Sequence, residues 1–147
     1  MKPFRLMVVM LLLGGALVLP ACRSSGVLSP DPRIDDEGYR QIMAMPDDST
    51  KERLLGEFIL NSIGGPICTG SGQCRTMEFG SKACGGPQSY LVYSTATTDS
   101  AALLILVKQF NALQDEMNRK YRRISDCGLP PRPRVGCVDG RCAEVSD

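Results

Sequence analysis

Six of the seven cysteines in this chain lie beyond residue 67, and they constrain its fold more than any other feature. They are Cys68, Cys74, Cys84, Cys127, Cys137 and Cys142. Disulfides brace small domains in oxidising compartments, whereas zinc sites show characteristic spacings of cysteine and histidine. The chain has no histidine, and its cysteine spacings are not those of a zinc site. We therefore expect three disulfides, no metal site and no cofactor.

The tail from residue 135 to residue 145 predicts a β-hairpin. Asp139 and Gly140 suit the two-residue type I′ turn, in which both residues have positive φ. This turn places Cys137 opposite Cys142 on one face, in a closely spaced pair without mutual backbone hydrogen bonds. The two cysteines could then bond to each other, or reach two different partners among Cys68, Cys74 and Cys84.

Two helices are predicted from apolar periodicity and capping signals. Ser49 followed by Glu52 fits a capping box, so a first helix is expected over Thr50–Ile63. A longer helix is expected over Ser100–Ile124, and Cys127 just beyond it should tie its end to the sheet. Its apolar stripe, spaced by three and four residues, consists of Leu103, Leu106, Val107, Phe110, Leu113, Met117, Tyr121 and Ile124.

Between these helices the pattern changes to short extended runs separated by glycines. Arg75–Phe79 and Tyr90–Thr95 alternate and carry aromatic and β-branched residues, so two strands joined by the loop Gly80–Gln88 are expected. The predicted fold class is α+β: a small disulfide-braced antiparallel sheet packed by one long and one shorter α-helix.

The N-terminus has the layout of a secretory signal. Lys2 and Arg5 precede an apolar run over residues 6–19, which is too short for a transmembrane helix. Leu19 and Ala21 stand before Cys22 as in a bacterial lipobox. This resemblance implies lipid attachment at Cys22, cleavage before it, and a membrane contact through the acyl chains.

The same resemblance implies a location and a division of the chain. Arg23 follows the cysteine where an inner-membrane retention signal usually has Asp, which favours the outer membrane with the domain in the periplasm. Residues 1–21 are expected to be a signal peptide and residues 48–147 a single six-cysteine domain. Residues 22–47, rich in Ser, Pro and Asp, are expected to be a flexible tether, with one possible helical turn over Tyr39–Met45.

Composition argues against several functions. Without Lys2 and Arg5 the formal net charge changes from +1 to −1, so nothing favours a nucleic-acid partner. The absence of histidine removes imidazole chemistry, and no pairing of Ser, Lys or carboxylates has catalytic spacing, so no catalytic residue and no enzyme activity are expected. The basic cluster Arg119, Lys120, Arg122 and Arg123 is expected to offset a helix dipole rather than to meet an anionic surface.

The cysteine spacing carries a second resemblance, to an uncharacterised six-cysteine domain of bacterial secreted proteins and lipoproteins. It rests on Cys74-Arg75, Cys84-Gly85-Gly86-Pro87, Ser125-Asp126-Cys127 and Gly140-Arg141-Cys142, and it implies a disulfide scaffold without an activity. The function expected is a non-enzymatic binding or structural module with an envelope protein as possible partner. The alternative is an inhibitor or immunity-like module that presents the loop 64–74 or 81–88 to a hydrolase.

Overall fold

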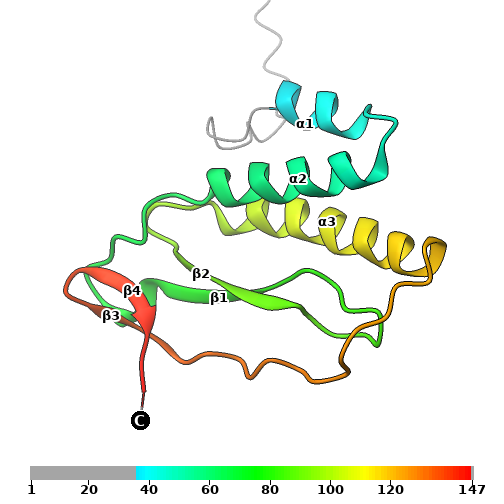
Figure 1. Ribbon diagram of the computed structural model, residues 1–147. Coiled ribbons are helices and arrows are strands. Elements are labelled where there is room, and N and C mark those ends of the chain that lie inside the picture. The colour runs from blue at the N-terminus through cyan, green and yellow to red at the C-terminus, as the bar shows by residue number, and fades with distance from the viewer. Residues whose placement is uncertain (1–35, 147) are drawn as a thin grey trace, which may run out of the picture.

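The computed structural model describes residues 36–146, so the predicted signal, Cys22 and most of the predicted tether lie outside the described residues. Three α-helices, one 3₁₀ turn and four strands follow one another along the chain (Figure 1). They are α1 (Asp36–Met43), α2 (Asp48–Ser62), η1 (Ser71–Gln73), β1 (Cys74–Phe79), β2 (Ser89–Ser94), α3 (Ser100–Lys120), β3 (Val135–Val138) and β4 (Arg141–Glu144). The fold class is α+β, as the sequence predicts.

The helices form successive layers above the β1–β2 hairpin, with α3 between α2 and the sheet (Figure 1). α1 lies in the part of residues 22–47 that the structure describes, and it packs on the core through Tyr39 and Ile42. Its position coincides with the helical turn expected near Tyr39–Met45. The domain therefore has a third, outer helix layer that stands at the end of the predicted tether.

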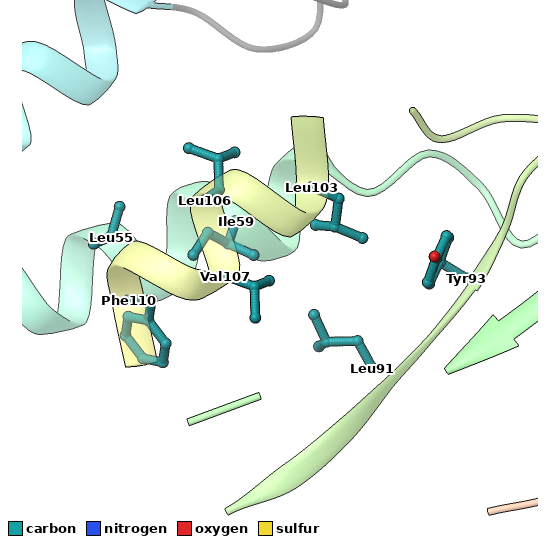
Figure 2. Close-up of a cluster of buried hydrophobic side chains, with 8 residues drawn as sticks. All are labelled: Leu55, Ile59, Leu91, Tyr93, Leu103, Leu106, Val107 and Phe110. Carbon is teal, nitrogen blue, oxygen red and sulfur yellow. The ribbon is translucent and has the colours of Figure 1, made fainter. Parts of the chain in front are cut away.

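The main core lies between α2, α3 and β2 (Figure 2). Leu55 and Ile59 of α2 are fully buried, and Gly56 between them lets Phe110 approach: a Cβ at Gly56 would stand 3.4 Å from the Phe110 ring. The predicted apolar stripe of α3 is confirmed for its buried members Leu103, Leu106, Val107, Phe110 and Met117. Burying each such side chain contributes about 1.5–3 kcal/mol, so this layer supplies much of the folding free energy.

The β1–β2 hairpin is antiparallel, with Met77 opposite Leu91 and Thr76 opposite Val92. The Thr95 amide donates to the Gln73 carbonyl at 2.9 Å. Since hydrogen-bonded and non-hydrogen-bonded pairs alternate along an antiparallel ladder, the odd-numbered residues of β1 form the backbone hydrogen bonds to β2. The backbone groups of the even-numbered residues, including Thr76 and Glu78, therefore point away from β2 along the outer edge of β1.

The C-terminal hairpin forms a second, separate sheet. Asp139 and Gly140 have φ of 49° and 74°, which confirms the predicted type I′ turn. Cys137 lies opposite Cys142, and the Cys142 amide donates outward to the Pro66 carbonyl at 2.6 Å. The pair is thus the non-hydrogen-bonded kind that the turn predicts. Ile67 forms an isolated antiparallel bridge with Arg141 on the outer edge of β4.

Two predicted helix ends are wrong. α2 begins at Asp48 and is capped by Asp47, whose Oδ2 accepts from the Thr50 amide at 2.7 Å, because Glu52 is engaged by distant partners instead of closing a capping box with Ser49. α3 ends at Lys120 rather than at Ile124, whose side chain is 96% exposed. The chain leaves the helix at Arg122, which has φ of 50°.

Candidate functional site

The six predicted cysteines form three disulfides: Cys68–Cys137, Cys74–Cys142 and Cys84–Cys127. Their Cα–Cα distances are 6.0, 5.4 and 5.4 Å. Of the alternatives open for the hairpin, the structure shows that Cys137 and Cys142 take two different partners. Cys127 ties the segment after α3 to the loop of the β1–β2 hairpin.

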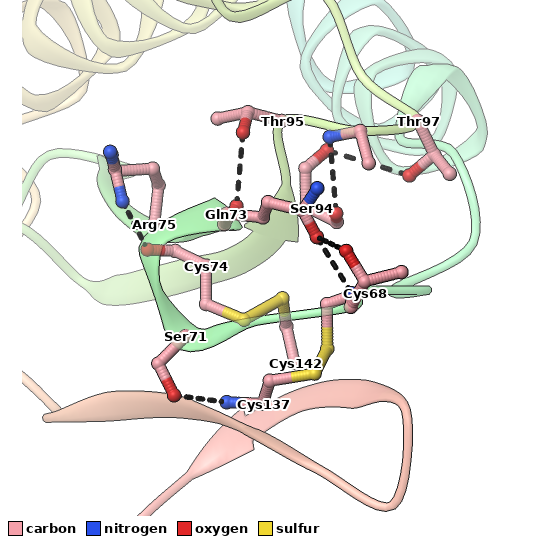
Figure 3. The surroundings of a disulfide bond; sticks show 12 residues. Cys68, Ser71, Gln73, Cys74, Arg75, Ser94, Thr95, Thr97, Cys137 and Cys142 are labelled. Atoms are coloured by element: carbon pink, nitrogen blue, oxygen red, sulfur yellow. Dashed lines mark hydrogen bonds between the residues drawn. A yellow bond between two sulfur atoms is a disulfide. The ribbon is translucent and has the colours of Figure 1, made fainter.

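The first two bridges lie side by side and clamp the C-terminal hairpin to the start of β1 (Figure 3). The Sγ atoms of Cys68, Cys74 and Cys142 lie within 4.8 Å of one another, but all three are oxidised, so none offers the thiolate that a metal needs. Ser71 adds a polar tie, because its Oγ accepts from the Cys137 amide at 3.1 Å. The arrangement is a rigid clamp.

The third bridge fixes the loop 81–88 against the segment that follows α3. Lys82 reinforces it: its Nζ contacts Asp126 Oδ1 at 2.7 Å and also donates to the Gly128 carbonyl. The hydrogen bond from Lys82 to the Asp126 carboxylate holds the pKa of Asp126 below its usual value. Gly86 completes the turn with φ of 81°, packed so closely that a Cβ there would stand 2.3 Å from Leu129 Cδ2.

Three amide side chains of α3 hold the start of the same loop, and sequence reasoning missed them. Asn111 Oδ1 accepts from the Gly80 amide at 2.8 Å, Gln114 Oε1 accepts from the Ser81 amide at 2.7 Å, and Asn118 Nδ2 donates to the Ser81 carbonyl at 2.9 Å. Their spacing on one helix face was the available signal. The buried Gln114 lies between Phe110 and Met117 on the same face of α3 as the predicted apolar stripe.

The predicted basic cluster is divided by its partners: two of its four cations bond to carboxylates of α2. Lys120 Nζ donates to Asp48 Oδ2 at 2.6 Å. Arg123 donates to both carboxylate oxygens of Glu52, at 3.0 and 2.8 Å. The Lys120 hydrogen bond lowers the pKa of Asp48, and the Arg123 hydrogen bonds lower that of Glu52. These two cations connect the end of α3 to the first turns of α2, which is a structural role.

Arg119 and Arg122 face a shallow pocket of about 450 Å³ beside Lys82 and the Cys84–Cys127 bridge. Within residues 36–146, neither arginine forms an ion pair. Arg122 occupies the left-handed position that ends a helix, where glycine is usual and other residues are strained. Asp115, which accepts a hydrogen bond from Ser81, lines the same pocket. The pocket has cationic walls and one carboxylate.

A second groove, of about 350 Å³, runs between α3 and the outer edge of β1. Leu104, which is 40% exposed, and Val107 line its helix side, and Thr76 and Met77 line its strand side. Lys108 stands on the same helix face. This groove is more apolar than the basic pocket and lies along open backbone.

Several serine, lysine and carboxylate side chains have structural partners. Ser81 and Lys82 are adjacent in the chain, but Ser81 donates to Asp115 and Lys82 contacts Asp126. Asp47 caps α2. The lipid-attachment residue Cys22 lies outside the described residues, and no helix within residues 36–146 is long and apolar enough to cross a membrane.

Comparison with family models, with curated protein sequences and with solved structures found no match to this chain.

Proposed function

We propose that this protein is a lipid-anchored envelope module that binds another envelope component without catalysis. The observation that carries the proposal is the set of three disulfides, which span 69, 68 and 43 residues and fix the irregular segments to the sheet and to one another. Ordering a loop or a side chain on binding costs free energy, and a surface that is already rigid avoids much of that cost. Disulfides are also consistent with a domain that folds outside the cytoplasm.

The anchor is tested by replacing Cys22 with Ser in the full chain and separating membranes from soluble contents. We expect the variant to leave the membrane fraction, while the neighbouring control Ser24→Ala remains with it. Mass spectrometry of the mature N-terminus should detect acyl chains on the wild type and on Ser24→Ala, but not on Cys22→Ser. A Cys22→Ser variant that still fractionates with outer membranes would refute the anchor.

The binding role is tested by cross-linking the anchored chain in intact cells. We expect one envelope component to be linked by the wild type and not by an unrelated domain that carries the same lipid anchor. Equal recovery with the wild type and with an unrelated lipid-anchored domain would contradict the proposal.

One feature favours the alternative of an inhibitor or immunity-like module. The loop 81–88 is turned back on itself, braced by Cys84–Cys127 and exposed at Ala83 and Gly85. Such a loop could enter the cleft of a hydrolase with little ordering cost. Titration of the secreted chain against periplasmic and secreted hydrolases tests this role, and a hydrolase inhibited at equimolar amounts would replace the first proposal.

A further inference from the structure

The outer edge of β1 exposes unpaired backbone groups. Because the even-numbered residues of β1 point away from β2, their N–H and C=O groups need partners elsewhere. The Cys74 carbonyl accepts from the Arg75 side chain at 2.8 Å, and the Glu78 carbonyl accepts from Asn111 Nδ2 at 3.4 Å. The Thr76 amide, the Thr76 carbonyl and the Glu78 amide have no hydrogen-bond partner within residues 36–146. They form a short, unprotected edge of the kind that accepts another strand.

The second groove lies directly along these groups. A strand added to β1 would place alternate side chains toward α3, where the partly exposed Leu104 offers apolar contact. Its other side chains would point toward the opposite face of the sheet. There Arg132 lies with its guanidinium 5.8 Å from the Tyr90 ring centre. No described residue of β2 lines this groove, so the groove belongs to the edge of β1.

Charge indicates what kind of strand fits. Lys108 and Arg132 both line the groove, and neither contacts a carboxylate within the described part of the chain. Glu78 adds one negative charge, so the groove retains a net positive charge. An acidic side chain beside an apolar one would complement this lining, whereas a basic strand would be repelled.

We propose that the β1 edge binds an extended, acidic segment of a partner protein by strand addition, with an apolar side chain against Leu104. The inference rests on the proposed binding function and names the chemistry of the partner. Backbone hydrogen bonds to Thr76 and Glu78 would supply affinity, and the groove and its cations would supply selectivity.

The probe is a hexapeptide of alternating valine and glutamate with blocked ends, added to the oxidised chain of residues 23–147 and followed by amide NMR. At saturation we expect the Thr76 and Glu78 amides to shift and to exchange with solvent about tenfold more slowly. The matching valine–lysine peptide should bind about fivefold more weakly. The same acidic peptide with alternate backbone nitrogens methylated should not bind, since it cannot form the edge hydrogen bonds.

Matched variants distinguish binding in the groove from non-specific binding. Lys108→Glu should reverse the preference between the acidic and basic peptides. Glu78→Gln should strengthen binding of the acidic peptide. Thr76→Pro removes an outward N–H without breaking the β1–β2 ladder and should abolish binding. Val92→Pro makes the equivalent change on the β2 edge and should leave peptide binding unchanged.

Three results would overturn the proposal. One is the absence of shifts at Thr76 and Glu78 with millimolar acidic peptide. Another is shifts confined to the β2 edge or to the pocket at Arg119. The third is concentration-dependent shifts at Thr76 without peptide, which would assign the edge to a second copy of this chain. If these tests fail while the anchored chain still cross-links to an envelope component, the binding function stands and only the strand-addition site is wrong.

Discussion

Removal of the two clustered disulfides, separately and together, tests how the clamp stabilises the fold. Cys68–Cys137 and Cys74–Cys142 close loops of 69 and 68 residues, and either one alone brings nearly the same parts of the chain together. When Cys74–Cys142 is intact, Cys68–Cys137 closes only a small additional loop. This loop consists of the six-residue step from Cys68 to Cys74 and the five-residue step from Cys137 to Cys142. The two stabilising effects therefore overlap but do not duplicate each other.

The chain-entropy relation gives the magnitudes. Closing a loop of 68 residues stabilises the fold by about 4.4 kcal/mol, and closing the remaining loop of about 11 residues adds about 2.8 kcal/mol. Replacing either pair of cysteines by Ala should thus lower the free energy of unfolding by about 2.8 kcal/mol, and replacing both pairs by about 7 kcal/mol. The double loss exceeds the sum of the single losses by about 1.6 kcal/mol.

The assay is urea unfolding of the oxidised proteins, followed by circular dichroism. All four proteins are compared in the same concentration of trimethylamine N-oxide, which keeps the weakest one folded. A double loss equal to or smaller than the sum of the two single losses would refute the reasoning, because neither bridge would then compensate for the loss of the other.

Three further predictions concern single residues. Glu52→Gln should lower stability at pH 7 by about 1.5 kcal/mol; because Arg123 lowers the pKa of Glu52, this contribution is present above the usual carboxyl pKa and lost as pH falls through the lowered one, so parallel urea-unfolding curves from pH 7 to 3 for variant and wild type would contradict it. Arg122→Gly should raise the melting temperature, by relief of about 1 kcal/mol of left-handed strain; an unchanged or lower value would show that the arginine side chain offsets that strain. Gly86→Ala should destabilise the fold by about 1–3 kcal/mol, since its φ is 81° and its Cβ would collide with Leu129; wild-type stability in urea would mean that the loop relaxes freely.

Local patterns in the sequence were enough to predict most elements of this fold. The α3 stripe follows from its period, and the Asp139-Gly140 turn follows from the backbone angles that a two-residue hairpin needs. Helix ends were less predictable, because they depend on distant partners. Glu52 could close a capping box, yet it bonds to Arg123, 71 residues away, and the left-handed arginine that ends α3 carries no local signal.

The disulfide pairing depends on a tertiary contact that no local pattern reveals. Cys137 and Cys142 lie side by side, a geometry that permits a mutual bond as readily as two separate ones. The choice follows from residues 66–68, which pair with the outer edge of β4 and bring Cys68 to the hairpin. The C-terminal hairpin forms its own sheet, and its two cysteines bond to Cys68 and Cys74 from outside that sheet. Each of these bonds joins residues 69 or 68 positions apart in the sequence, so no local pattern could select them over a bond within the hairpin.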